Sequence, residues 1–173
     1  MYLNLGVKTL YVIRHAKSSW DSPFSDDHDR PLNDRGKRDA PRMGKRLKEK
    51  EIHPGIMVSS TAKRALSTAK RIAKVLGYPK DNIKTDRGLY HADEVTTLNI
   101  VQELKDNVDT AMIFSHNPGL TDFVNSLMDG ELDIDNVPTC GVVAFKFDVE
   151  SWSDVQWGTG KILFFDYPKS RED

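Results

Sequence analysis

The sequence has little cysteine, little net charge and no long apolar run, and each of these absences excludes a class of protein. Cys140 is the one cysteine in 173 residues, so no internal disulfide can form, and a reducing compartment is compatible with the chain. The 25 lysines and arginines are balanced by 26 aspartates and glutamates, which argues against a protein built to grip nucleic acid. No apolar run approaches the ~20 residues that cross a membrane, and the N-terminus lacks the apolar core of a signal peptide. We therefore expect a cytoplasmic protein without nucleic-acid or membrane partners.

The composition fits a folded domain. A chain of 173 residues is long enough to bury a substantial core. Its 38% of apolar and 29% of charged residues are typical of globular proteins and not of disordered ones. We expect a single domain over residues 1–173, and a monomer. His28 and His53 stand in polar segments without partners at metal-ligand spacing, so no metal or cofactor is expected.

Short apolar runs alternate with segments of helical periodicity. The runs predict strands at residues 9–13, 55–59, 82–85, 110–114, 142–147 and 162–165. The periodic segments predict helices at about 33–47, 60–77, 94–104 and 119–128. This alternation indicates an α/β fold in three layers, with a mostly parallel central sheet of about six strands flanked by helices. Because no helix separates the last two strands, one edge of the sheet is expected to be antiparallel.

Particular residues mark the expected helix boundaries. Asn33 is predicted to cap the first helix, and Pro41 within its pattern to kink or delay it. Ser60 or Thr61 is predicted to cap the second helix, which Gly77 then ends.

Polar side chains follow three of the predicted strands. They are Arg14 and His15 after the first, Ser59, Ser60 and Arg64 after the second, and Ser115, His116 and Asn117 after the fourth. The carboxyl ends of parallel strands meet at one edge of a sheet, where ligands of open α/β folds bind. Two histidines and two arginines are therefore expected to converge there.

The chemistry of that set suits phosphate. Arginine presents paired, permanently charged donors that match phosphate oxygens, and a neutral imidazole is a good nucleophile that can carry a covalent intermediate. Phosphoryl transfer needs mainly positioning and stabilisation of charge on the equatorial oxygens. Taken singly, each residue has a simpler structural explanation, and only the shared position favours a phosphate site. Both interpretations stay open at this point.

Four ordered segments are similar to a known family. Residues 10–21, with Arg14-His15-Ala16, resemble the Arg-His-Gly signature of the histidine phosphatase superfamily, most closely its small SixA-like phosphohistidine phosphatases. Residues 30–33 with Gly36, 58–65 with 68–69, and 114–120 resemble further blocks of the family in the same order. The resemblance covers residues 9–165. Ala16, Thr61 and Ser115 depart from the common residues, but each is small and should leave the pocket open.

The resemblance implies a fold, an activity and a set of roles. The fold would be the minimal core of phosphoglycerate mutase-like proteins, without a cap domain. His15 would be the phosphorylated nucleophile of a metal-independent phosphatase, and Arg14, Arg64 and His116 would hold the transferred phosphoryl group. Lys17, Ser18 and Asn117 are expected to contact the substrate.

Three candidates could donate the proton that the leaving group needs. Asp21 occupies a position where the superfamily often has asparagine, and an ionised aspartate would repel phosphate, so it is a candidate acid. His91 occupies the position of the usual glutamate and could donate when protonated. Asp93 and Glu94 are more simply explained as the start of a helix, where acids suit the dipole. The third candidate is a phosphohistidine substrate, whose own ring can carry the proton.

Three functions are compatible with this pattern. The first is hydrolysis of phosphohistidine in a protein substrate. The second is a phosphatase or mutase acting on a small phosphorylated molecule, against which the short chain argues. The third is a module that binds phosphorylated protein without turnover. The presence of the expected nucleophile His15 together with Arg14, Arg64 and His116 argues against it.

Overall fold

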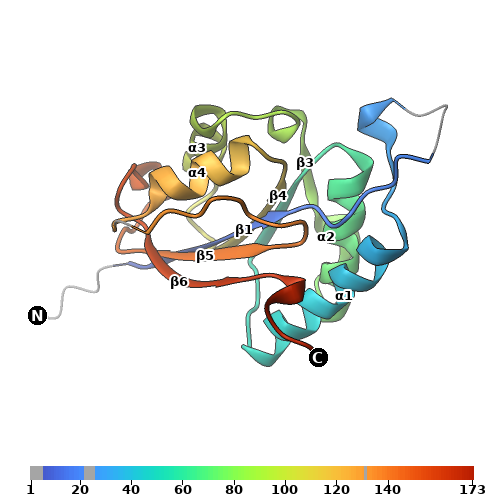
Figure 1. The fold of residues 1–173 in the computed structure, drawn as a ribbon. Coiled ribbons are helices and arrows are strands. Elements are labelled where there is room, and N and C mark those ends of the chain that lie inside the picture. The colour runs from blue at the N-terminus through green and yellow to red at the C-terminus, as the bar shows by residue number, and fades with distance from the viewer. Residues whose placement is uncertain (1–5, 22–25, 131) are drawn as a thin grey trace, which may run out of the picture.

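The computed structural model describes residues 6–21, 26–130 and 132–173. Its centre is a six-stranded sheet in the order β3-β2-β4-β1-β5-β6 (Figure 1). The strands are β1 (Lys8–Arg14), β2 (Ile56–Ser60), β3 (Lys84–Asp86), β4 (Thr110–Ser115), β5 (Val142–Phe147) and β6 (Lys161–Asp166). The strands from β3 to β1 are parallel, whereas β5 runs antiparallel to β1 and β6 antiparallel to β5. The mostly parallel sheet and its antiparallel edge are thus confirmed.

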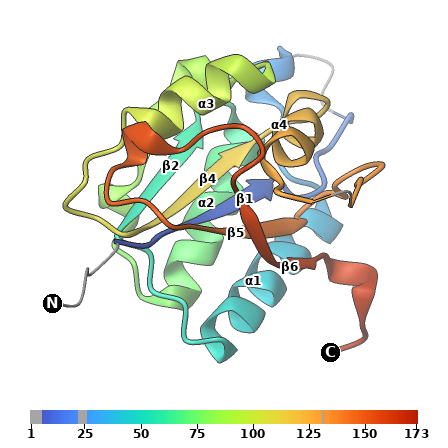
Figure 2. The same ribbon diagram turned by 90° about the vertical axis from the view of Figure 1, so that its left-hand side faces the viewer.

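Helices cover both faces of the sheet, which confirms the three layers. They are α1 (Asp34–Glu49), α2 (Lys63–Leu76), α3 (Glu94–Gln102) and α4 (Gly119–Leu127). The pair α1 and α2 covers one face and the pair α3 and α4 the other (Figures 1 and 2). Over the described residues, none of these helices is long and apolar enough to span a bilayer.

The period-two alternation of β1 divides the core between the two faces. Leu10 and Val12 pack in the cluster that contains the apolar residues of α3 and α4. Tyr11 and Ile13 pack in the opposite cluster, with the apolar residues of α1 and α2. Because both faces are buried, β1 appears in the sequence as a continuous apolar run.

The helix ends show which boundary predictions were right. Asn33 caps α1 by accepting a hydrogen bond from the Gly36 amide at 2.9 Å, as predicted. Pro41 does not delay the helix, which begins at Asp34 and continues through the proline; the cap and the buried apolar face on either side outweigh one missing amide bond.

The second helix differs from its prediction at one end only. Its N-cap residue is Ala62, not Ser60 or Thr61, and no side chain caps it. Ser60 Oγ instead accepts from the Ala62 amide at 3.2 Å, because Ser60 still belongs to β2. Gly77 ends α2 with a φ of 73°, the left-handed conformation that glycine adopts without strain.

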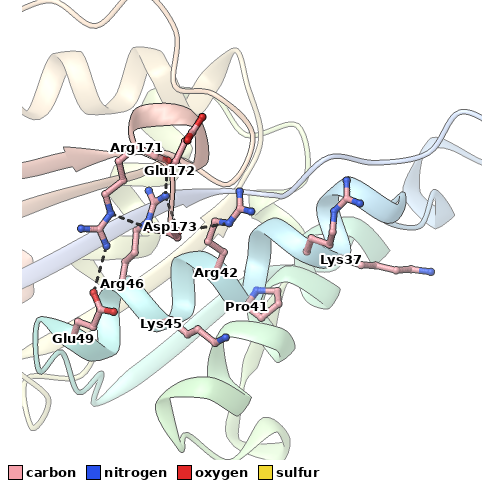
Figure 3. Close-up of a pocket in the computed structure, with 10 residues that line it drawn as sticks. Lys37, Pro41, Arg42, Lys45, Arg46, Glu49, Arg171, Glu172 and Asp173 are labelled. Carbon is pink, nitrogen blue, oxygen red and sulfur yellow. Dashed lines mark hydrogen bonds and ion pairs between the residues drawn. The ribbon is translucent and has the colours of Figure 1, made fainter.

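The C-terminal segment is anchored to α1 by one buried arginine (Figure 3). Arg46, whose side chain is 2% exposed, pairs with Asp166 at 3.2 Å and with Asp173 at 2.8 Å. Its guanidinium also donates to the carbonyls of Tyr167 at 2.9 Å and Pro168 at 3.0 Å. A groove of about 810 Å³ lies beside this anchor, and none of the predicted phosphate-site residues lines it.

Candidate active site

The carboxyl ends of β1, β2 and β4 bring the predicted residues together. Arg14 pairs with Ser115 across β1 and β4, and Ser59 pairs with Phe114 across β2 and β4. His15, which follows β1, therefore lies beside His116, which follows β4, with 5.2 Å between the ring centroids. The parallel register places both histidines at one edge of the sheet.

The backbone around His15 is held by three other segments. Its amide donates to the Ser115 carbonyl at 3.1 Å, and its carbonyl accepts from the Cys140 amide at 3.0 Å. The following amide, of Ala16, donates to Thr68 Oγ1 on α2 at 2.9 Å. Bonds to β4, to the loop before β5 and to α2 thus fix the position from which the imidazole projects.

The His15 imidazole is set up as a neutral base. Its Nδ1 lies 2.7 Å from the Ala16 carbonyl oxygen, which can only accept, so Nδ1 carries the proton and Nε2 keeps its lone pair. Burial, helped by the charges of Arg64 and Arg14, lowers the pKa of His15 to about 3. At neutral pH the ring is therefore uncharged, the form in which histidine acts as a nucleophile.

His116 and Arg14 complete one side of the site. His116 Nε2 lies 2.8 Å from Ser60 Oγ, and burial, with the neighbouring His15 and Arg64, lowers the pKa of His116 to about 3. Arg14 donates from Nη1 to the Val137 carbonyl at 2.9 Å. Within the described part of the chain, His116 Nδ1 and Arg14 Nε are buried without a hydrogen-bond partner. Buried polar atoms of this kind are costly, and such atoms are expected where a ligand binds.

Arg64, in the first turn of α2, contacts a residue that the sequence had not singled out. Its Nη1 donates to the Asp27 carbonyl at 2.6 Å and its Nη2 to Asp27 Oδ2 at 3.0 Å. The same Oδ2 accepts from the Tyr90 hydroxyl at 2.6 Å, and Arg30 donates to Oδ1 at 3.0 Å. The Tyr90 hydrogen bond, with the charges of Arg64 and Arg30, lowers the pKa of Asp27 to about 2.

Three functional candidates were therefore missed by sequence reasoning: Asp27, Arg30 and Tyr90. Arg30 is a third arginine of the site, since its charge also lowers the pKa of His15. Arg30 stood in a family-like segment and could have been considered, but Asp27 is one acid among several in a polar loop and carried no signal of its own.

The two predicted proton donors have different surroundings. His91 has a φ of 59°, unusual for a residue with a side chain, and its Nε2 lies 3.7 Å from Asp27 Oδ2. Its ring lies 4.0 Å from that of Tyr90 and 6.4 Å from that of His116, with the side chain 66% exposed. Asp21 is exposed, and its amide bonds to Ser19 Oγ at 3.1 Å. Residues 22–25, which follow it, lie outside the described residues.

The helix that follows His91, α3, begins where the sequence predicts it. Asp93 caps α3 by accepting from the Thr96 amide at 2.8 Å, which confirms its structural interpretation.

The three residues predicted to contact substrate also support the local fold. The Lys17 carbonyl accepts from the Asn33 amide at 3.0 Å, and Ser18 Oγ accepts from Arg30. Asn117 donates to Asn136 Oδ1 at 2.9 Å and accepts from the Thr121 hydroxyl at 2.8 Å. Their contacts with substrate stay predictions.

A hollow of about 240 Å³ adjoins the His116 side of the site. It is lined by His91, Ala92, Asp93, His116, Asn117, Pro118, Gly119 and Asp122. A side chain at position 119 would collide with the Ala92 carbonyl, so glycine is what allows this approach of α4. Over residues 6–21, 26–130 and 132–173, no group of three or more histidine, cysteine and acidic side chains could hold a metal ion.

Comparisons with known proteins point to one family. A family model for the histidine phosphatase superfamily (branch 1) matches residues 10–93. An uncharacterized chloroplastic protein of Arabidopsis thaliana is 28% identical over 155 residues, which are 85% of this chain and 70% of the relative.

Two solved structures share the fold. The protein histidine phosphatase SixA complexed with tungstate matches with a TM-score of 0.79 at 21% identity, over 93% of this chain and 97% of SixA. A mycobacterial glucosyl-3-phosphoglycerate phosphatase complexed with VO3 matches with a TM-score of 0.68 at 13% identity, over 92% and 99% of the two chains. At these identities the likeness establishes the fold.

Proposed function

The chain belongs to the histidine phosphatase superfamily, and from this we propose that it hydrolyses phosphohistidine in proteins through a covalent intermediate on His15. The observation that carries the proposal is the state of His15: a neutral ring with its proton on Nδ1, beside Arg14, Arg64 and His116. The fold shared with SixA supports a phosphatase of this kind.

The reaction would take two steps. In the first, the Nε2 lone pair of His15 attacks phosphorus, and the bond from phosphorus to the leaving nitrogen or oxygen breaks with its electrons. Arg14, Arg64 and His116 would hold the equatorial oxygens, on which charge is concentrated in the transition state. In the second, a water oxygen attacks phosphorus, the bond from phosphorus to Nε2 breaks, and inorganic phosphate leaves with His15 restored.

The surroundings of the site favour a substrate that needs little help from an acid. Asp27, with a pKa of about 2, is ionised at neutral pH and is a poor proton donor. His91 lies at the rim with most of its side chain in water. A phosphohistidine whose ring is protonated brings a good leaving group of its own, so its hydrolysis would proceed without a strong acid. Asp21 and His91 remain the candidates for esters.

The direct test compares a phosphohistidine protein with a panel of phosphate esters. We expect phosphohistidine to be hydrolysed much faster, and a ³²P-labelled, acid-labile phosphoenzyme to be trapped during turnover. His15→Ala, the matched control, should lose activity by more than about a thousandfold, because no other group takes over the nucleophile's role. Rapid hydrolysis of esters with phosphohistidine left untouched would contradict the proposed substrate, and an active His15→Ala protein would contradict the mechanism.

A further inference from the structure

The carboxylate of Asp27 binds Arg64, a residue that is expected to bind an anionic ligand. Both terminal nitrogens of Arg64 donate to Asp27, one to its carbonyl and one to its carboxylate. Arg30 donates to the second carboxylate oxygen at 3.0 Å. Arginine binds phosphate through the same kind of paired donors. Asp27 therefore occupies donors that a phosphoryl group held by Arg64 would use.

The two partners of this contact differ in their access to water. The Arg64 side chain is 6% exposed, whereas that of Asp27 is 40% exposed and lies in a short 3-10 turn, Asp27–Asp29, at the surface. A carboxylate that leaves the contact can be hydrated, but the buried guanidinium cannot, and it then requires another anion. The contact is thus built so that the anion can be exchanged and the cation stays in place.

The local charge favours such an exchange. Arg14, Arg30 and Arg64 all act on His15, each lowering its pKa by its positive charge. Asp27 is the carboxylate that bonds to two of these three arginines. A phosphoryl dianion that replaced it at Arg64 would restore and exceed the lost negative charge.

We propose that Asp27 is an internal competitor for the phosphate site: its carboxylate binds Arg64 in the free protein, gives way to a phosphoryl group and returns when phosphate leaves. This rests on the proposed function in one respect, namely that Arg64 holds the transferred group. The competition weakens the binding of substrate and of product phosphate together, and so it favours product release.

A different role for Asp27 would have the opposite effect on binding. If the residue served only to hold Arg64 in the right orientation, its removal would leave the guanidinium misplaced, and anions would bind more weakly. The direction of the change in anion affinity therefore separates competition from orientation.

The experiment is a calorimetric titration of the protein with tungstate, a tetrahedral dianion. Asp27→Asn keeps the size of the side chain and an acceptor for Tyr90 but removes the charge. We expect it to bind tungstate about tenfold more tightly than the unaltered protein, since a charge-assisted contact no longer has to be broken. The KM for a phosphorylated substrate and the inhibition constant of inorganic phosphate should fall with it.

Two controls isolate the contact from a general charge effect. Asp29→Asn removes the same charge two residues away, from a side chain paired only with His28 in the described structure, and should change the affinity less than about twofold. In an Arg64→Ala background, Asp27→Asn should gain far less than it does alone, because the shared partner is missing. Thermal melting of each variant confirms that it is folded.

The outcomes separate this proposal from the proposed function. Unchanged or weaker tungstate binding by Asp27→Asn, or an equal gain in the Arg64→Ala background, overturns the competitor role even if the protein is an active phosphatase. Tighter binding by Asp27→Asn in a protein that hydrolyses no phosphohistidine supports the competitor role and contradicts the proposed substrate.

Discussion

Two buried arginines, in two regions of the molecule, have different surroundings. Arg46 on α1 and Arg64 on α2 are 2% and 6% exposed, and both pair with aspartate. Arg46 is bound by the carboxylates of Asp166 and Asp173 and by several backbone carbonyls of the C-terminal segment. In the described part of the chain, the side-chain hydrogen bonds of Arg64 go to Asp27.

The two guanidinium groups differ in the number of acceptors and in the charges that surround them. Around Arg46 the donors are matched by acceptors from several residues, so exchange of one partner would leave the others in place. Around Arg64 the neighbouring charges include Arg14 and Arg30, and the balancing carboxylate is half in water. The many acceptors around Arg46 favour a structural role for this arginine. The carboxylate contact of Arg64 with Asp27 agrees with our proposal that a substrate anion replaces Asp27 there.

The largest expected effect is on stability at the anchor. Arg46→Ala should lower the free energy of unfolding by about 3 kcal/mol, because it leaves buried acceptors and two aspartates without their partner. Urea denaturation measures the loss, and Arg42→Ala is the control. Arg42 reaches Asp173 at 3.5 Å from a much more exposed position, so its removal should cost less than about 1 kcal/mol. Equal stability of the two variants would show that the anchor is not structural. Steady-state kinetics of Arg46→Ala should be unchanged.

Arg64→Ala should impair catalysis and leave stability nearly unchanged, the reverse of the effect expected for Arg46→Ala. We expect kcat to fall about a hundredfold, equivalent to about 2.7 kcal/mol of transition-state stabilisation, because charge on the phosphoryl oxygens loses a donor. Stability should change by less than about 1 kcal/mol, since Asp27 keeps Tyr90 and Arg30 as partners. Arg71→Ala, an exposed arginine on the same helix, is the matched control for kinetics and melting. An Arg64→Ala protein that is unstable but fully active would show that Arg64, like Arg46, has a structural role.

The two regions also differ in how their stability depends on pH. The folded pKa of His15 and His116 is about 3, below the ordinary 6.5, so between these values the unfolded chain binds more protons. Their contribution to stability is present above pH 6.5 and is lost as the pH falls toward 3. At the anchor, the Arg46 hydrogen bond holds the pKa of Asp173 below its usual 3.8, so this carboxylate stays charged to lower pH than a free one.

Unfolding free energies measured between pH 7 and 4 test this difference. His15→Ala should flatten the fall by up to about 1.4 kcal/mol per pH unit, the effect of one proton. Removal of the exposed His53 should leave the slope unchanged. A slope that His15→Ala does not alter would mean that His15 titrates alike in the folded and unfolded chain.

Much of the fold was predictable because it follows from local periodicity. All six strands and four helices of the described residues were expected from apolar runs and helical spacing, and β1 shows why: its alternating residues fill two cores. The meeting of Arg14, His15, Arg64 and His116 at one edge of the sheet was predictable from parallel topology and family-like segments. The errors concern single residues: Pro41 does not delay the start of α1, and the N-cap of α2 is Ala62 and not Ser60 or Thr61, because packing and caps compete with local preference.

The sequence by itself determined the elements, the mostly parallel sheet and the convergence of two histidines with two arginines, because those features have a period or a motif. Only the tertiary structure decided that Asp27 binds Arg64, 37 positions away, and Tyr90, 63 positions away. A loop carboxylate has no periodicity, and several acids nearby could have taken its place. The pairing depends on how the turn Asp27–Asp29 packs on α2, and so the carboxylate that binds Arg64 is identified only once the chain is folded.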